Sequence, residues 1–321
     1  MSKFCGYHQR NSIASIYCPA VNTKPALQIL TGPTAVGKTE SALKWALEHN
    51  AEILSCDSLL FYRGMNIGTA KPGPEALRRV PHHMIDIVSV AAQFSIKAYL
   101  EQAQAVVEAI IGRGRRVLIV GGSGFYLKSF FAPVVDAIEA SPEIVARVTR
   151  LEQSRGIEGL LEELVARNPD GLGKLDHHNP RRVAKALQRC LASGRPLLEL
   201  QAEFAKLKSP FADYEKRVTL LSRQPEDLWQ RICARVEGMF AAGLLAEVEK
   251  LQLQGIENNS SAARAIGYRE TLEFIKTGQS DLAALKQRIA INTRRLVAKQ
   301  RKWFRNHLMV DRVIDLSANE F

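Results

Sequence analysis

The residues with the clearest chemistry form a glycine-rich segment near the amino terminus. Residues 32–39 read Gly-Pro-Thr-Ala-Val-Gly-Lys-Thr and fit the pattern GxxxxGK[ST] in full. In this pattern glycines let backbone N–H groups converge on phosphate oxygens at a helix N-terminus, the lysine adds a positive charge, and the threonine offers a hydroxyl ligand for Mg²⁺. The pattern predicts a phosphate loop for a diphosphate or triphosphate, bound by Gly32, Pro33, Thr34, Ala35, Val36, Gly37, Lys38 and Thr39.

A carboxylate, Asp57, is the second candidate for chemistry. The apolar residues 53–56 predict a strand that delivers Asp57 to its carboxyl end, where binding sites of parallel sheets lie. Position alone leaves two interpretations of Asp57 open, a functional acid or a turn residue. The most apolar strand candidate, residues 117–120, ends at Gly121 instead of the magnesium-holding acid that hydrolytic motors and ATPases use.

Alternating strands and helices must position these groups. The apolar and helical patterns predict a parallel α/β sheet with a P-loop NTPase-like core. The expected strands are residues 26–30, 52–56 and 116–120, and the expected helices are residues 39–48 and 94–111.

The character of the chain changes after Phe131. Charged, amphipathic helical segments follow, broken at Pro142, Gly156 and several Gly and Asn-Pro positions, before strand-like residues 217–221 and helices from near Pro225. This predicts a helical insertion domain set within the α/β core. We assign residues 1–24 to a flexible extension, residues 25–131 and 208–321 to the core with its C-terminal basic helices, and residues 132–207 to the insertion.

Composition restricts the class of protein. The 321 residues are 46% hydrophobic and 24% charged, which is typical of a folded globular protein. The five cysteines form no CxxC pair, so neither a zinc site nor a disulfide framework is indicated, and a cytoplasmic location is expected. No run approaches the ~20 apolar residues of a membrane helix, and residues 1–24 lack the apolar stretch of a signal peptide.

The net charge of +11 is concentrated near the C-terminus, where residues 281–310 hold eight basic residues and one acid. Leu282, Leu285, Ile289 and Leu296 recur there at helical spacing. One face of this helix is therefore expected to pack while the basic side chains stay on the other. Composition alone leaves a nucleic acid, a membrane surface or plain solvent as what this basic face meets.

The segment after Asp57 carries a family resemblance. Residues 57–72, DSLLFYRGMNIGTAKP, resemble the DSxxxYRGMDIGTAKP segment of the tRNA dimethylallyltransferases, with Asn66 in place of Asp. PHHMIDI at residues 81–87, VGGS at 120–123 and GYRE at 267–270 are similar to other segments of that family. The resemblance, to the bacterial type without a zinc finger, covers nearly all of the chain after residue 24. The adjacent His82 and His83 are expected to be structural, because neighbouring side chains on an extended segment point to opposite faces.

The resemblance implies an activity and roles for particular residues. The family transfers a dimethylallyl group from dimethylallyl diphosphate to the exocyclic amine of the adenine adjacent to the anticodon in tRNA. The phosphate loop would then hold the diphosphate, and Lys38 would contribute positive charge. Thr39 would bind Mg²⁺, and the Thr34 hydroxyl would lie near the bridging oxygen. Asp57 would accept the proton of the amine. An arginine from residues 228–236 would help to neutralise the charge on the leaving diphosphate, and Arg235 is favoured over Arg231.

The resemblance also implies an RNA surface. A monomer is expected because one chain has enough elements for the whole site, and no membrane partner is expected because no long apolar run is present. At Arg181, Lys185, Arg301 and Lys302 the residues differ from the usual family types, and all four are cationic. The expected tRNA contacts are Asp57, Ser58, Leu59, Leu60, Ser123, Arg181, Arg182, Val183, Ala184, Lys185, Arg264, Gly267, Tyr268, Arg269, Arg294, Arg295, Lys299, Gln300, Arg301, Lys302, Trp303, Phe304 and Arg305.

Two other classes share the phosphate loop. A small-molecule P-loop kinase has the same strand, loop and helix but normally carries arginines in a mobile lid over ATP. A non-enzymatic RNA-binding NTP switch is the third class, and the missing hydrolytic acid disfavours it.

Overall fold

A six-stranded sheet forms the centre of the protein, whose computed structural model describes residues 25–317. The expected extension, residues 1–24, lies outside the described residues. All neighbouring strands pair in parallel, in the order β3-β2-β4-β1-β5-β6. The predicted parallel α/β fold is therefore confirmed. The strands are β1 (Ala26–Thr31), β2 (Ala51–Ser55), β3 (His82–His83), β4 (Arg116–Gly121), β5 (Glu215–Ser222) and β6 (Arg312–Asp315).

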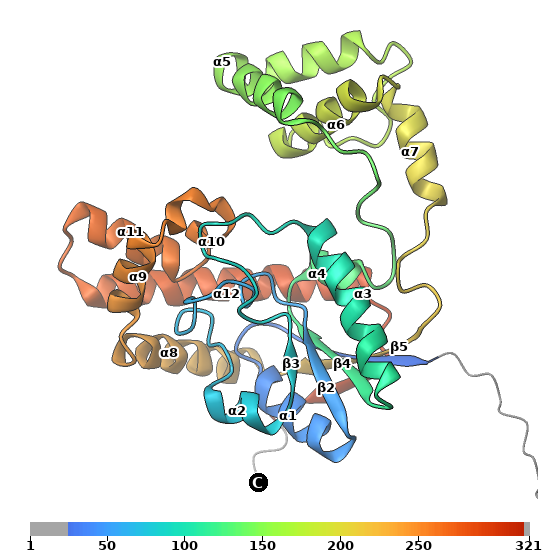
Figure 1. Cartoon of the computed structure of the whole chain (residues 1–321). Helices are drawn as coiled ribbons and strands as arrows, with labels where there is room; N and C mark the ends of the chain where they lie inside the picture. The colour runs from blue at the N-terminus through green and yellow to red at the C-terminus, as the bar shows by residue number, and fades with distance from the viewer. Residues whose placement is uncertain (1–24, 318–321) are drawn as a thin grey trace, which may run out of the picture.

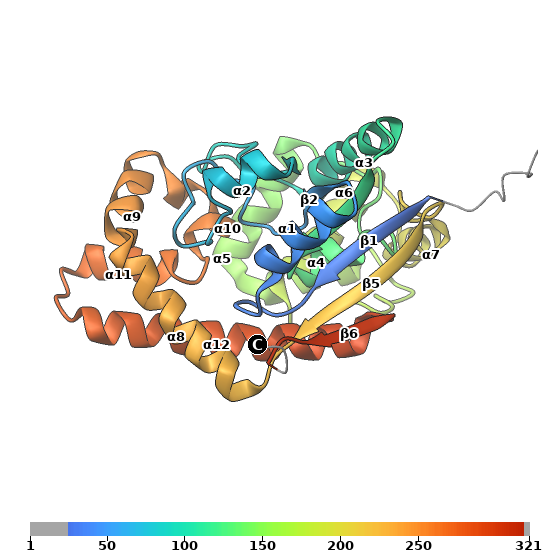
Figure 2. The same cartoon turned by 90° about the horizontal axis from the view of Figure 1, so that it is seen from below.

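Helices cover both faces of this sheet, which explains why its central strands are apolar on both sides. One face packs against α1 (Lys38–Glu48) and the helices from α8 onward. The other packs against α3 (Ile96–Gly112), α4 (Gly124–Lys128) and the end of the last helix, at Phe304. Figures 1 and 2 show α8 to α11 gathered at one side of the sheet, with α12 extending from them. These helices are α8 (Pro225–Ala241), α9 (Leu244–Leu253), α10 (Ser260–Ala263), α11 (Tyr268–Thr277) and α12 (Leu282–His307), with a 3₁₀ turn at Ile256–Asn258.

Three helices stand apart from the sheet (Figure 1). They are α5 (Pro142–Ala166), α6 (Pro180–Ser193) and α7 (Leu197–Lys206), and all lie within residues 132–207. Their buried side chains, among them Leu160, Leu164 and Leu187, form a hydrophobic cluster separate from the two beside the sheet. Gly156, with a φ of 61°, interrupts α5 where the sequence predicts a break.

Some elements differ from the expectations. Four short elements have no counterpart among the predicted ones, namely β3, β6, α2 (Pro74–Arg79) and α4. Leu282, expected on the packed face of the basic helix, is 40% exposed because it is the first residue of α12, and Leu285 and Ile289 begin the buried face instead. Within residues 25–317, no helix is long and apolar enough to cross a membrane.

Candidate active site

The phosphate loop joins β1 to α1 and is shaped by two glycines. A Cβ on Gly32 would lie 2.7 Å from the backbone oxygen of Leu221, and Gly37 has a left-handed φ of 109° at the N-terminus of α1. The ammonium group of Lys38 folds under the loop and donates to the carbonyl oxygens of Gly32 and Pro33, both at 2.9 Å. Removal from water lowers the pKa of Lys38 to about 8, and the charge of Asp57 opposes that shift.

Two arginines hold the outer carbonyl groups of this loop. The Nε of Arg231 donates to Ala35 O and the Nε of Arg223 donates to Val36 O, each at 3.0 Å. Ala35 has a left-handed φ of 67°, a costly conformation for a residue with a Cβ, which needs support from its surroundings. Arg231 also lines the cavity over the loop.

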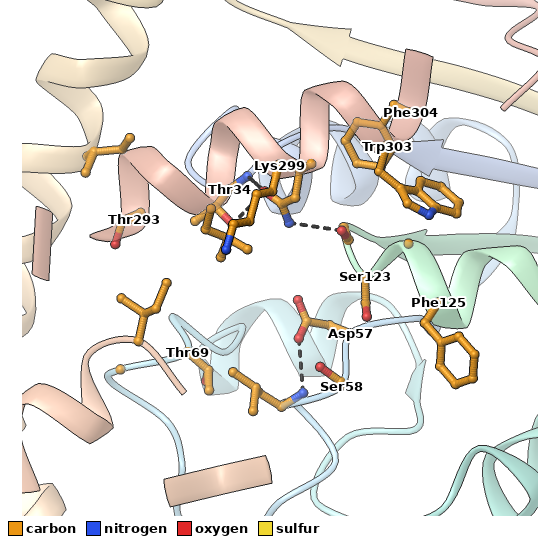
Figure 3. Close-up of a pocket in the computed structure, with 18 of the residues that line it drawn as sticks. Thr34, Asp57, Ser58, Thr69, Ser123, Phe125, Thr293, Lys299, Trp303 and Phe304 are labelled. Atoms are coloured by element: carbon orange, nitrogen blue, oxygen red, sulfur yellow. Dashed lines mark hydrogen bonds between the residues drawn. The ribbon is translucent and has the colours of Figure 1, made fainter. Parts of the chain in front are cut away.

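Two cavities, of about 750 and 560 Å³, adjoin at the phosphate loop. Four residues line both, namely Thr34, Asp57, Thr69 and Arg235, so the cavities meet there. The smaller cavity lies over the loop, including Lys38. The larger one opens between α4, α8 and α12 and is lined in part by Ser58, Ser123, Phe125, Lys299 and Trp303 (Figure 3).

Asp57 lies at this junction. It follows β2 by two residues, and its Oδ1 accepts a hydrogen bond from the backbone N–H of Leu59 at 3.1 Å. Asp57 therefore supports a turn and also lines both cavities (Figure 3), and its role as a functional acid stays a prediction. Its charge raises the pKa of both Lys38 and Arg235. A carboxylate between two cations can accept a proton from a group bound in the larger cavity.

Arg235 also reaches the junction, from α8. Burial lowers the pKa of its guanidinium, and its Nη2 donates to the carbonyl oxygen of Thr69 at 3.1 Å. Arg235 lines both cavities, whereas Arg231 lines only the one over the loop. The structure thus brings together Thr34, Lys38, Asp57 and Arg235, the residues expected to catalyse the reaction.

Gln300 occupies a position that no sequence pattern predicts. Expected among the tRNA contacts, it lines the larger cavity and also contacts the phosphate loop: its Oε1 accepts from the backbone N–H of Thr34 at 2.9 Å and from the Thr34 hydroxyl at 3.2 Å. Its Nε2 donates to Gly122 O at 2.9 Å. A Cβ on Gly122 would lie 2.9 Å from that Nε2, so any other residue there would displace the end of the Gln300 side chain.

Apart from the half-buried Arg301, which donates to a backbone carbonyl, the expected tRNA contacts fall into three groups. One group lines the cavities and comprises Asp57, Ser58, Leu59, Leu60, Ser123, Arg182, Lys299, Gln300, Trp303 and Phe304. A second group is exposed and comprises Arg181, Lys185, Arg264, Arg269, Arg294, Arg295, Lys302 and Arg305. The third group is buried and comprises Val183, Ala184, Gly267 and Tyr268, which present almost no side-chain surface, so their expected contact with RNA stays a prediction.

The basic residues of α12 do not form one surface. Arg294 stacks over Trp229, with its guanidinium carbon 5.2 Å from the ring centre, and Arg301 donates to Arg223 O at 2.6 Å. Arg305 lines a separate pocket beside Pro33. Helical spacing places the exposed Arg295, Lys299 and Lys302 on another face, and Lys299 lines the larger cavity.

The residues present fit a magnesium ion held jointly with phosphate. Mg²⁺ typically binds one or two protein groups and completes its coordination with substrate phosphates and water. Thr39 and Glu40, at the start of α1, line the cavity over the loop. Among residues 25–317 no cluster of three or more His, Cys, Asp or Glu side chains could hold a metal by itself. His82 and His83 contact Val80 O and Glu52, in agreement with their expected structural role.

A phosphate loop at the end of β1, with an acid and a half-buried arginine beside a second cavity, defines an α/β phosphate-loop protein suited to group transfer. A sequence model of a known family, IPP transferase, matches residues 60–307 of the chain. A protein named tRNA dimethylallyltransferase from Opitutus terrae is 53% identical over 296 residues, which is 92% of this chain and 95% of the relative. The chain therefore belongs to the IPP transferase family.

Solved structures agree with this membership. The full-length tRNA isopentenylpyrophosphate transferase of Bacillus halodurans is 31% identical, with a TM-score of 0.66 over 93% of this chain and 92% of that one. The tRNA delta(2)-isopentenylpyrophosphate transferase of Staphylococcus epidermidis is 29% identical, with a TM-score of 0.64 over 93% and 95% of the two chains.

Proposed function

We propose that this protein transfers a dimethylallyl group from dimethylallyl diphosphate to the N6 amine of the adenosine 3′ to the anticodon in tRNA, releasing diphosphate. The observation that carries the proposal is the meeting of two cavities at Thr34, Asp57 and Arg235. One cavity presents cations and a phosphate loop to a diphosphate. The other is large enough for a base and is lined by the cations Lys128, Arg182 and Lys299.

The reaction requires two kinds of help. The carbon–oxygen bond of the allylic diphosphate breaks as the bond from N6 to that carbon forms, and negative charge grows on the leaving diphosphate. Lys38, Arg235 and the N–H groups of the phosphate loop stabilise that charge. The Thr34 hydroxyl would lie near the bridging oxygen. Because the lone pair of the amine is delocalised into the ring, the amine becomes strongly acidic as it attacks, and its proton passes to Asp57.

A magnesium ion belongs in this proposal at the phosphate loop. The Thr39 hydroxyl would hold it against the diphosphate, as in other phosphate loops. When bound, Mg²⁺ adds positive charge that helps the diphosphate to leave.

The target adenine must leave the anticodon stack to enter the larger cavity. Extruding a base costs on the order of a few kcal/mol, which contacts to the RNA backbone offset. Arg182 of α6 and Lys299 of α12 both line this cavity, so the insertion and the core would hold the RNA together. The site is complete within one chain, and we propose a cytoplasmic monomer.

The test of this function is the choice of substrate. The protein is incubated with Mg²⁺ and either dimethylallyl diphosphate or ATP, with and without unmodified tRNA, and products are separated by chromatography. We expect diphosphate release from dimethylallyl diphosphate only when tRNA is present. Consumption of ATP without tRNA would favour the small-molecule kinase, and ATP hydrolysis without group transfer would favour the switch.

A further inference from the structure

Glu247 of α9 lies outside both cavities, and its carboxylate binds the backbone of residues 66–68, next to a residue that lines both cavities. Its Oε2 accepts the backbone N–H groups of Asn66 at 3.1 Å and Ile67 at 2.8 Å, and its Oε1 accepts that of Gly68 at 3.2 Å. The hydroxyl of Tyr268 donates to Oε1 at 2.7 Å. Four donors therefore converge on one side chain.

The anchored segment leads directly to the active site. Thr69, the next residue, lines both cavities, and its carbonyl oxygen accepts the hydrogen bond from Arg235. Gly68 packs so closely on Tyr268 that a Cβ there would lie 2.5 Å from the ring. Ala70, which follows, has a left-handed φ of 50°.

Local hydrogen bonds shape the turns of this segment, since the Ala70 N–H donates to Ile67 O at 3.0 Å and the Lys71 N–H to Asn66 O at 2.9 Å, but they leave the N–H groups of residues 66–68 to Glu247. Residues 63–73 contain turns but neither helix nor strand, so the backbone N–H groups of residues 66–68 have no ladder partners. Hydrogen bonds from N–H groups to an ionised acceptor are about twice as strong as neutral ones. A single carboxylate that takes three successive N–H groups fixes the orientation of that backbone, and with it the direction of the Thr69 carbonyl.

We propose that Glu247 is a positioning residue for prenyl transfer. It holds residues 66–68 so that the Thr69 carbonyl keeps the Arg235 guanidinium aimed at the diphosphate. The inference rests on the proposed function for its catalytic consequence, but its effect on diphosphate binding does not require transfer to occur. It explains how a residue of α9, outside both cavities, influences the leaving-group site.

The test substitutes Glu247→Gln, which keeps the shape of the side chain and removes its charge. The matched control is Glu249→Gln, an exposed residue of the same helix. We expect Glu247→Gln to raise the KM for dimethylallyl diphosphate about tenfold, with the tRNA Kd unchanged within about twofold. Glu249→Gln should match the wild type. Tyr268→Phe, which removes one donor of four, should show a smaller change in the same direction.

A double-mutant cycle with Arg235→Ala separates positioning from general destabilisation. Glu247→Gln should add almost nothing to the loss of dimethylallyl diphosphate affinity in the Arg235→Ala background, since its effect passes through that arginine. An undiminished effect of Glu247→Gln in that background would overturn the inference. So would a loss of tRNA affinity equal to the loss of dimethylallyl diphosphate affinity, because that indicates an unfolded or globally altered site.

Binding is measured without tRNA by calorimetry, with dimethylallyl diphosphate as the probe and the melting temperature of each variant as a check. If the wild type binds the probe but transfers nothing to tRNA, the proposed function fails while the positioning of Arg235 is still tested by the binding cycle. Equal affinity of the wild type and Glu247→Gln would refute the positioning role whether or not transfer occurs.

Discussion

Asp57 accepts the Leu59 N–H, and we propose that it also accepts the amine proton; one substitution can separate these two roles. Asp57→Asn keeps an oxygen that can accept the Leu59 N–H but removes the base. We expect the single-turnover rate of prenyl transfer to fall at least about 100-fold, the usual size of a general-base contribution, while tRNA affinity stays within about twofold. Rapid-quench kinetics and filter binding measure the two quantities. A variant that retains the wild-type rate would exclude Asp57 as the proton acceptor.

Lys38 is expected to give diphosphate binding a pH dependence. Its pKa is lowered to about 8, so the free protein loses this cation as the pH rises through about 8. A bound diphosphate stabilises the cation and raises that pKa. Binding above pH 8 must therefore take up a proton, and affinity must fall as the pH rises.

Calorimetry of dimethylallyl diphosphate binding, without tRNA, tests this expectation. The titration is made at about pH 8.5, just above the Lys38 pKa of about 8, in buffers of different ionisation enthalpy. The wild type should then take up protons on binding. Lys38→Met should bind more weakly and lose that uptake. Proton uptake of the same size in Lys38→Met would assign the titration to another group.

At the scale of single elements, the phosphate loop shows what sequence can and cannot predict. The strand, loop and helix follow from local patterns, since the glycines and Lys38 lie within one short motif. The groups that hold the loop in shape come from far along the chain, as with Arg223, Arg231 and Gln300. No local pattern pairs Gln300 with Thr34, because the pairing exists only once α12 packs across the end of the sheet.

The basic helix α12 illustrates the same limit. Its helical spacing predicts one packed face and one charged face. Tertiary packing divides the charged residues further, because α8 and the strand end after β5 use Arg294 and Arg301 as packing partners. Which cations remain for RNA therefore depends on neighbours that the helix sequence does not specify.

We expect the face formed by Arg295, Lys299 and Lys302 to bind RNA phosphates. Replacing all three by Glu should weaken tRNA binding and lower the slope of log K against log salt by about one unit for each phosphate that is no longer neutralised. Lys250→Glu on α9 serves as the matched control for an exposed cation. Filter binding over a range of salt concentrations provides the slope, and an unchanged slope would show that this face does not bind RNA.

At the scale of the whole molecule, two units with separate hydrophobic cores surround one site. The insertion helices enclose their own cluster, yet Arg182 of α6 lines the larger cavity together with residues of the core. The change from strand-forming to helical segments after Phe131 predicts the insertion. How α6 lies relative to α12 could not be predicted, because two separate cores leave no continuous pattern between them.

Because the insertion and the core have separate hydrophobic cores, we expect substitutions in the insertion to change tRNA affinity without changing dimethylallyl diphosphate affinity. Reversing the charge of the exposed Arg181 and Lys185 should weaken tRNA binding about tenfold or more and leave dimethylallyl diphosphate affinity without tRNA unchanged. Combined with the α12 replacements, the losses should add in free energy, because distant sites act independently. Calorimetry and filter binding on the three variants check this. An altered affinity for dimethylallyl diphosphate would show that the insertion shapes the phosphate site itself.

The measurement that tests prenyl transfer most directly is mass spectrometry of tRNA nucleosides after reaction. Unmodified tRNA with an adenosine 3′ to its anticodon is incubated with the protein, dimethylallyl diphosphate and Mg²⁺, then digested. We expect N6-dimethylallyladenosine from that position with the wild type, and none with Asp57→Ala, which should still bind tRNA. Unmodified adenosine at that position after reaction with folded, tRNA-binding wild-type protein would contradict the proposed function.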